Sequence, residues 1–319
     1  MRKIGHRKHA LSAAFSACLL AYADPVLATD CKPLLEQFNQ AIDTAQEAGA
    51  QALVDEIAGS ADCGQFQTRA QQRLSALRLS AAQILMARGR PSAEYERLLT
   101  ASETTEVLWQ ASATLGEVRF GERRFAQAAE AYDRAIDIVK NERLTPDQPE
   151  KFEIEGLLTR AAQARLLAAN VKMADGTTQF VQTARDKRDG TLGGIYSRSV
   201  RGITPQAVPV PITFEYAKTT FTQIGEQAAR ELADALKEQR PTQITLVGHT
   251  DVRGSDETNV KLSEARAEAV AAYLKNAGVG TAIETKGVGS SEPVKLLDSA
   301  GLSQDDIYAL NRRVEFIRQ

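Results

Sequence analysis

Residues 248–270 read GHTDVRGSDETNVKLSEARAEAV, and this stretch decides the architecture of the last third of the chain. A short apolar run, ITLVG at residues 244–248, leads to Asp251 at its end, and a helical pattern of small and charged residues follows from Leu262. An apolar strand that ends in a polar turn and continues into a helix is a building unit of α/β proteins. We therefore expect a strand followed by a helix at this place.

The same alternation continues on both sides of that stretch. The helical pattern of that stretch continues to residue 278 as LSEARAEAVAAYLKNAG (262–278). Four further runs have strand-like or helix-like patterns: VPITFEY (210–216), QIGEQAARELADALKEQ (223–239), IETKGVG (283–289) and NRRVEFIRQ (311–319). Strands that alternate with helices predict an α/β sandwich in which the helices pack on one sheet. We assign this domain to residues 208–319.

Two charged residues of this domain stand where folding alone gives little reason for them. Asp251 leaves the end of a strand, and Ser263 is suited to cap the following helix, which would put Arg266 at its third position. A cation there opposes the helix dipole at a cost of up to about 1 kcal/mol. The pair would suit a zwitterionic ligand, whose ammonium would bind Asp251 and whose carboxylate would bind Arg266. A structural salt bridge between the two residues is the alternative.

The order of the motifs resembles the OmpA-like C-terminal domain, a module also found in Pal lipoproteins and flagellar stator proteins. The resemblance covers residues 208–319 and is carried by GHTD, Asn259, LSEARAEAV, the GVG strand end, Pro293 and NRRVEF. It implies noncovalent binding of peptidoglycan, with Asp251 and Arg266 holding the ammonium and carboxylate of diaminopimelic acid in the stem peptide. It also implies that Asn259 and Arg312 line the same groove.

This chain departs from the family pattern at two places. Ala217 stands where many relatives have a short polar residue, so one side contact of the groove is in doubt. The segment LLDSAGLSQDDIYALNRRV, residues 296–314, is longer and differently charged than usual. Neither departure touches the two charged poles.

Residues 29–172 carry a helical pattern, with breaks near Gly59, Gly89, Gly121 and Pro146. This pattern predicts an all-α domain of antiparallel helical hairpins. Within it, the run LGEVRFGERRFAQAAEAYDRAIDI has small and aromatic residues at positions that resemble a tetratricopeptide repeat. We expect a short tetratricopeptide-like array that presents a face to a protein partner. The alternative is a helical bundle whose apolar stripes serve only its own core.

The two expected domains are joined by residues 173–207, which are rich in Gly, Thr, Arg and Asp and show no sustained period. This composition is typical of a linker or an extended arm. At the other end, residues 1–28 show four basic residues, an apolar run and small residues, which is the pattern of a secretory signal peptide. A lipid on Cys18 is a weaker alternative for that segment.

Cys31 and Cys63 remain as a pair once the expected leader is removed. In an oxidising compartment two cysteines favour a disulfide, and a metal site is the weaker alternative because no histidine lies near them in the sequence. The 319-residue chain has a net charge of −2, which excludes the broad basic field of a nonspecific nucleic-acid or anionic-membrane binder. We expect a periplasmic protein, associated with the cell wall or outer membrane, that needs no metal and no cofactor and has no transmembrane span once mature.

An enzymatic function has little support in the sequence. His249 and Asp251 alternate along a strand, but no serine follows in a nucleophile-elbow setting, so a hydrolase is disfavoured. The sequence predicts a non-enzymatic envelope protein that binds peptidoglycan through Asp251, Arg266, Asn259 and Arg312 and presents its helical domain to a partner. A scaffold whose C-terminal domain no longer binds peptidoglycan is the alternative.

Overall fold

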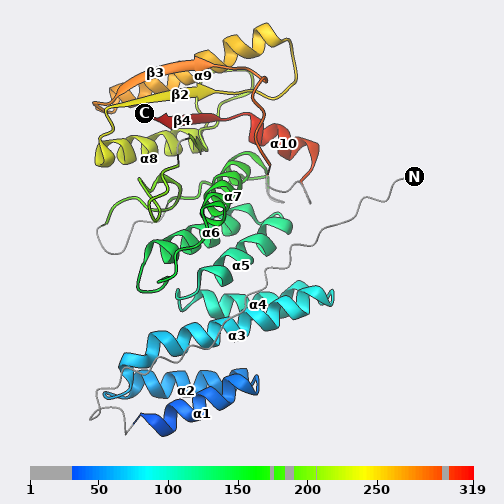
Figure 1. Cartoon of the computed structure of the whole chain (residues 1–319). Helices are drawn as coiled ribbons and strands as arrows, with labels where there is room; N and C mark the ends of the chain where they lie inside the picture. Colours follow the sequence, from blue (N-terminus) through cyan, green and yellow to red (C-terminus); the bar gives the residue numbers. More distant parts are fainter. Residues whose placement is uncertain (1–30, 173–175, 184–189, 206, 297–301) are drawn as a thin grey trace.

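The computed structural model describes residues 31–172, 176–183, 190–205, 207–296 and 302–319. The leader expected at residues 1–28, with Cys18, lies outside the described residues. Helices make up the N-terminal part, and a small sheet with helices makes up the C-terminal part (Figure 1). The predicted combination of an all-α domain and an α/β domain is therefore confirmed.

The N-terminal helices stack as successive hairpins along one direction (Figure 1). Their bounds are α1 (Lys32–Asp43), α2 (Glu47–Gly59), η1 (Gly64–Phe66), α3 (Gln67–Ala87), α4 (Ser92–Glu103), α5 (Trp109–Gly121), α6 (Phe125–Lys140) and α7 (Lys151–Asn170). Two of the expected breaks, at Gly59 and Gly121, are the last residues of α2 and α5, and Gly89 lies in the turn after α3 with a φ of 66°. Glycine tolerates that left-handed conformation without the steric cost of a side chain.

Helices α5 and α6 cross closely where the repeat-like motif lies. A Cβ atom on Gly116 would come within 2.7 Å of the Tyr132 ring, which is fully buried between the two helices. The small residue on α5 and the aromatic residue on α6 are therefore complementary parts of one contact, as the motif predicted.

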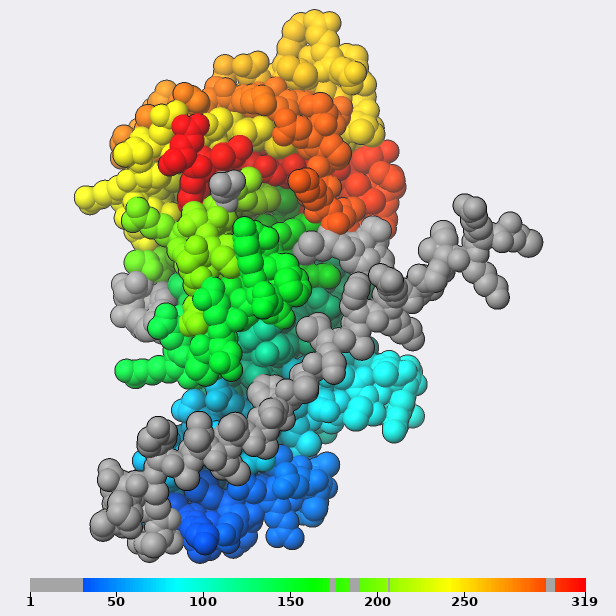
Figure 2. Space-filling view, viewed as in Figure 1, coloured from blue at the N-terminus to red at the C-terminus, as the bar shows by residue number. Residues whose placement is uncertain are grey.

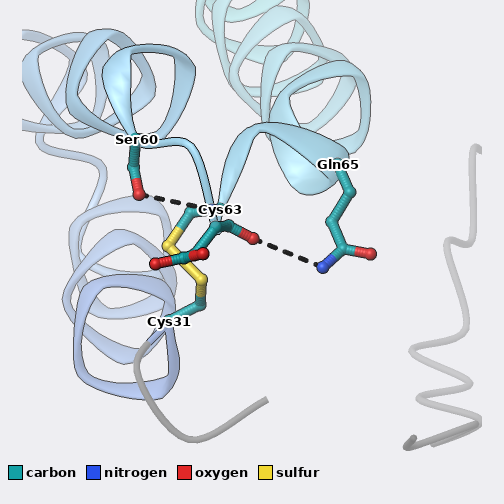
Figure 3. Close-up of a disulfide and its surroundings, with 5 residues drawn as sticks. Cys31, Ser60, Cys63 and Gln65 are labelled. Atoms are coloured by element: carbon teal, nitrogen blue, oxygen red, sulfur yellow. Dashed lines mark hydrogen bonds between the residues drawn. A yellow bond between two sulfur atoms is a disulfide. The ribbon is translucent and has the colours of Figure 1, made fainter. Parts of the chain in front are cut away.

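A disulfide joins Cys31, just before α1, to Cys63, just before η1 (Figure 3). The turn between α2 and α3 is closed by a 3.3 Å hydrogen bond from the Cys63 backbone N–H to the Ser60 hydroxyl. Both cysteines belong to a small apolar cluster, separate from the main core, that includes Phe38, Ile57 and Leu74. The disulfide thus reinforces a part of the chain that packs outside the main core.

The C-terminal sheet has the strand order β1-β4-β2-β3. Its elements, with the helices between them, are β1 (Ala207–Val210), α8 (Gln223–Gln239), β2 (Gln243–Gly248), α9 (Asp256–Asn276), β3 (Ala282–Gly287), α10 (Gln304–Asn311) and β4 (Val314–Arg318). Strands β2 and β3 are parallel, whereas β4 runs antiparallel to both β1 and β2. Helix α9 packs on β2 and β3 and buries Ala267, Val270 and Leu274 in the core.

The structure corrects two expected element boundaries. The strand expected at residues 210–216 is instead β1 at Ala207–Val210, because Val208 and Val210 pair with Phe316 and Val314 of β4. Residues 213–222 then form a small turn that is closed by backbone hydrogen bonds between Thr213 and Thr222 and between Glu215 and Thr220. The second correction concerns the start of α9 and is described with the site.

Residues 173–207 carry part of the junction between the two domains. In the described part of this segment, Leu192, Ile195, Tyr196 and Val200 are buried. They belong to a single apolar cluster that runs from Phe120 on α5 to Phe316 on β4. The last helical hairpins and the α/β domain therefore share one core, while α1 to α4 extend away from it (Figure 2). No helix in the described part of the chain is long and apolar enough to cross a membrane.

Candidate functional site

The loop that follows β2 is held at the end of the sheet by backbone hydrogen bonds. The N–H of His249 donates to the carbonyl of Arg313, and the N–H of Thr250 donates to the carbonyl of Gly289, each at 2.9 Å. These bonds fix the backbone on both sides of the loop and place Asp251 beyond the end of the strand. Its side chain is almost buried, with a residue exposure of 6%.

Helix α9 approaches the sheet at two glycines. A Cβ atom on Gly248 would lie 2.0 Å from the carbonyl oxygen of Ser263, and one on Gly287 would lie 2.4 Å from the backbone nitrogen of Glu264. Any other residue at these positions would push the helix away. The glycine of the GHTD motif therefore brings the middle of α9, which carries Arg266, against the end of β2.

The expected position of Arg266 in its helix is wrong. Helix α9 starts at Asp256, after Ser255, whose hydroxyl accepts a 3.3 Å hydrogen bond from the N–H of Thr258. Ser263 lies inside the helix, where its hydroxyl accepts a 2.9 Å hydrogen bond from the N–H of Gly289. Arg266 therefore faces no helix terminus, and the argument from the helix dipole does not apply to it.

The carboxylate of Asp251 is surrounded by donors from two arginines. Arg253 donates to it from its backbone N–H at 3.0 Å, from Nε at 3.1 Å and from Nη2 at 2.6 Å. Arg312 donates to the same carboxylate from Nη1 at 2.8 Å. Burial alone would raise the pKa of Asp251, but the hydrogen bonds from Arg253 and Arg312 outweigh it and lower the pKa to about 2. Asp251 is therefore ionised at neutral pH.

Arg266 has a different environment. Its side chain is buried, with a residue exposure of 7%; its Nε donates to the carbonyl of Lys218 at 3.1 Å, and its guanidinium lies 4.9 Å from the ring centre of Phe214. Burial lowers the pKa of Arg266 to about 10; repulsion from Arg312 adds to this effect and attraction to Asp251 opposes it. Within the described ranges no carboxylate forms an ion pair with Arg266, and the alternative Asp251–Arg266 salt bridge is not formed.

Asn259 and Arg312, the other two expected site residues, both contact the loop of Asp251. The amide of Asn259, in the first turn of α9, donates to the carbonyls of Asp251 at 3.3 Å and Arg253 at 3.1 Å. Arg312 follows α10 and reaches Asp251 with its side chain. The structure therefore brings Asp251, Asn259 and Arg312 together through direct contacts, with Arg266 close enough to repel Arg312.

Sequence reasoning missed two contributors to this site. Arg253 binds Asp251 directly, and its guanidinium lies 5.0 Å from the ring centre of Tyr308 on α10. A signal for Arg253 was present, because an aspartate commonly accepts a hydrogen bond from the backbone two residues further on. No signal pointed to Tyr308, since the turn that brings α10 beside the loop is a tertiary contact. The result is one carboxylate bound by two guanidinium groups, with a third, that of Arg266, close enough to be attracted to it.

His249 lies apart from the cluster around Asp251, beside Glu315 of β4. It is buried, and its Nε2 is 3.7 Å from a carboxylate oxygen of Glu315, which also accepts a 2.6 Å hydrogen bond from Arg313. Burial alone would raise the pKa of Glu315, but His249 and Arg313 lower it to about 2. The three residues line a cavity of about 1130 Å³ between α7 and the sheet, and Asp251 and Arg266 are not among its walls.

Comparison with known proteins places the C-terminal part in a family. The family model described as the OmpA family matches residues 213–303. The chain is 35% identical over 132 residues to the "Probable lipoprotein YiaD" of Escherichia coli, a match that covers 41% of this chain and 57% of that protein. It is 37% identical over 106 residues to the "Peptidoglycan-associated lipoprotein" of Legionella pneumophila, covering 33% of this chain and 57% of that protein.

One solved structure matches part of this chain. The crystal structure of the peptidoglycan-associated lipoprotein from Burkholderia pseudomallei has 28% sequence identity to this chain, covers 36% of it and 91% of that chain, and gives a TM-score of 0.29. Because this TM-score is low, the relationship to the OmpA family rests on the sequence matches alone. The chain spans little more than half the length of the two curated relatives named above, and its helical region lies outside the family match.

Proposed function

We propose, from the OmpA family domain that the chain carries at residues 213–303, that this protein binds peptidoglycan noncovalently and without chemical turnover. The ligand group is the zwitterionic end of diaminopimelic acid in the stem peptide. Its ammonium binds Asp251 and its carboxylate binds Arg266. Arg312 donates a hydrogen bond to Asp251 at the same site, and Asn259 holds the loop that carries Asp251.

The observation that carries this proposal is the state of Arg266. A buried guanidinium without a carboxylate partner is unfavourable, because the desolvation of its charge is only partly offset by one carbonyl and one aromatic ring. A ligand carboxylate would supply the missing charge. Arg312 lies near enough to repel Arg266, so an anion between them would be attracted to both.

The test is co-sedimentation of the chain without residues 1–28 with insoluble peptidoglycan that contains diaminopimelate. We expect the wild type to pellet, whereas Asp251→Ala and Arg266→Ala remain in the supernatant with a thermal transition close to wild type. Arg90→Ala is the matched control, since Arg90 is an exposed arginine on the helical domain that pairs with Glu94. This variant should pellet as the wild type does.

A second wall preparation tests the ligand group itself. Peptidoglycan with lysine in place of diaminopimelate keeps an ammonium at this position but lacks the carboxylate beside it, so binding should fall to the level of Arg266→Ala. Equal binding to both walls would exclude diaminopimelate as the recognised group. Failure of the wild type and both variants to pellet would favour the protein scaffold instead.

The helical domain would carry a second role, the presentation of a surface to a protein partner. Helices α1 to α4 lie outside the shared core and project away from the sheet (Figure 1). Ile84 and Met86, near the end of α3, are apolar and exposed. A photo-crosslinker at position 84 should give one defined adduct in cells, whereas one at Arg90 should not; no adduct at either would leave wall binding as the only role.

The proposed location is the periplasm, in association with the cell wall or outer membrane. The names of the two relatives support it, since they describe lipoproteins, one of them peptidoglycan-associated. A protein that binds the wall at one end and a partner at the other would act by tethering, with no reaction at either site.

A further inference from the structure

The acidic pole of the site is already occupied by the chain itself. Both carboxylate oxygens of Asp251 accept hydrogen bonds: Oδ1 from the backbone and Nε of Arg253, and Oδ2 from Nη2 of Arg253 and Nη1 of Arg312. An incoming ammonium therefore finds both carboxylate oxygens of Asp251 already hydrogen-bonded to arginines of the chain. One of the two guanidinium groups must yield before the ligand can bind Asp251.

Arg253 is the arginine that can leave at the smaller cost. Its side chain is 56% exposed, compared with 32% for Arg312, so its guanidinium can return to water more easily. Its backbone N–H can continue to donate to Asp251 after the side chain has left, which preserves the shape of the loop. Arg312 comes from a separate element, and its departure would break the hydrogen bond that joins the end of α10 to this loop.

The closed position of Arg253 is supported by a second contact. Its guanidinium lies 5.0 Å from the ring centre of Tyr308, a distance at which a cation is attracted to the aromatic face. Arg253 thus holds Asp251 through two side-chain hydrogen bonds and rests on Tyr308 on its other side. These contacts make the occupied state a defined arrangement of the free protein.

We propose that Arg253 is an internal competitor for the ligand's ammonium group: its guanidinium occupies the place of that ammonium on Asp251 and is displaced when the ligand binds. This inference rests on the proposed function, because it concerns the same site. A cation is needed for the exchange, since Asp251 is 6% exposed and a neutral group would leave its charge less compensated.

The charge balance of the cluster agrees with this exchange. Arg253, Arg266 and Arg312 surround Asp251, so three positive charges face one negative charge in the free protein. When the guanidinium of Arg253 moves out, a ligand ammonium replaces it on Asp251 and the ligand carboxylate compensates Arg266. The bound state then has two cations and one anion from the protein and one of each from the ligand, with less excess positive charge at close range.

The competition lowers affinity only for ligands that use Asp251. The probe is the tripeptide L-Ala-γ-D-Glu-meso-diaminopimelate, compared with the same peptide acetylated on its free diaminopimelate amine, and binding is measured by titration calorimetry. We expect Arg253→Ala to bind the free-amine peptide about two- to fivefold more tightly than the wild type, the size of an exposed ion pair. Its affinity for the acetylated peptide should be unchanged, because that peptide does not displace Arg253.

Lys261→Ala is the matched control, since it removes an exposed cation of α9 that pairs with Glu257 and does not touch Asp251. It should leave both affinities as they are in the wild type. Weaker binding of the free-amine peptide by Arg253→Ala would overturn the inference and make Arg253 a direct ligand contact. An equal change in affinity for both peptides would also overturn the inference, because it would show that the loss of a positive charge affects binding in general. If the wild type binds neither peptide, the proposed function fails together with the inference; binding by the wild type without tightening in Arg253→Ala rejects the inference alone.

Discussion

Arg123, in the turn between α5 and α6, binds Asp306, in the first turn of α10, through both of its terminal nitrogens. The Nη2–Oδ1 hydrogen bond measures 2.9 Å, and Asp306 is 1% exposed. Arg123 adopts a left-handed backbone conformation with a φ of 62°, which costs about 1 kcal/mol or more for a residue with a side chain. The helical domain therefore holds the helix that leads to Arg312 by a direct ion pair.

Replacing Arg123 should destabilise the chain measurably. Arg123→Asn keeps a residue that tolerates the left-handed conformation but leaves the carboxylate of Asp306 buried with the Ser303 cap as its remaining partner. We expect the free energy of unfolding to fall by about 1–2 kcal/mol. The loss is smaller than for a fully buried ion pair, because the Arg123 side chain is 43% exposed and solvent screens its charge. Chemical denaturation of this variant, of Asp306→Asn and of the double variant measures the coupling; additive effects would show that the pair contributes nothing.

Loss of the disulfide should weaken the N-terminal end. On the chain-entropy model, opening a loop with a sequence separation of 32 residues costs about 3 to 4 kcal/mol. Cys31→Ser should lower the thermal transition of the helical domain and leave pelleting with peptidoglycan unchanged, because Cys31 lies in a cluster apart from the shared core. Two reactive thiols in the native wild-type protein would contradict the disulfide.

A glycine-to-alanine substitution should have opposite effects on stability at the close crossing of α5 and α6 and on the open face of α7. Gly116→Ala puts a methyl group within 2.7 Å of the Tyr132 ring and should cost about 1–3 kcal/mol. Gly156→Ala on α7 is the matched control, since its added methyl group meets nothing within 4 Å and alanine favours a helix by up to about 1 kcal/mol. Thermal melts of the two variants should move in opposite directions; a neutral Gly116→Ala would mean that Tyr132 can move aside.

A buried glutamate between the domains should make stability depend on pH. Glu231 on α8 accepts a 2.6 Å hydrogen bond from the N–H of Thr183, and burial raises its pKa, with Arg165 and that hydrogen bond opposing the shift and Asp133 adding to it. A raised pKa in the folded state means that its contribution to stability is fully present below the unfolded value of about 4.3 and is lost as the pH rises through the folded value.

Glu231→Gln removes this titration and keeps an oxygen for the N–H of Thr183. We expect it to raise the free energy of unfolding at pH 8 relative to the wild type, and to raise it less or not at all at pH 4. Glu226→Gln, on the exposed side of the same helix, is the control and should behave as the wild type at both values. A stabilisation of Glu231→Gln that grows as the pH falls would contradict this assignment.

The sequence patterns predicted most of the fold because they record which face of each element is buried. The runs at 223–239 and 244–248 correspond closely to α8 and β2, and the run at 283–289 overlaps β3 and extends two residues beyond its end. The start of α9 was missed because the stretch from Asp256 to Lys261 is polar apart from one valine and shows no apolar period, although Ser255 followed by acidic residues is a normal helix start. Helix α10 was missed for a related reason: it is short, and its anchor, Arg123, lies far away in the sequence.

At the site, the sequence motifs identified some residues, and only the three-dimensional structure identified the others. The residues expected to hold the ligand, Asp251 and Arg266, came from motifs, and the structure places them at one end of the sheet. The partners that determine their electrostatic state did not come from motifs. The contact of Arg266 with Phe214 and the stacking of Arg253 on Tyr308 join elements that are distant along the chain, so only the tertiary structure could reveal them.

The core that continues from α5 to β4 has a mechanical consequence. Suppose that the C-terminal domain is held at the wall and that a partner pulls on α1 and α2. The force would then reach the sheet through the packed side chains of the cluster from Phe120 to Phe316. It would not pass through a flexible linker. Packed interfaces resist shear over short distances, whereas a flexible linker stretches first. The molecule would then act as a stiff rod, and the outermost hairpin, at which the force enters, is locked by the disulfide of Cys31 and Cys63.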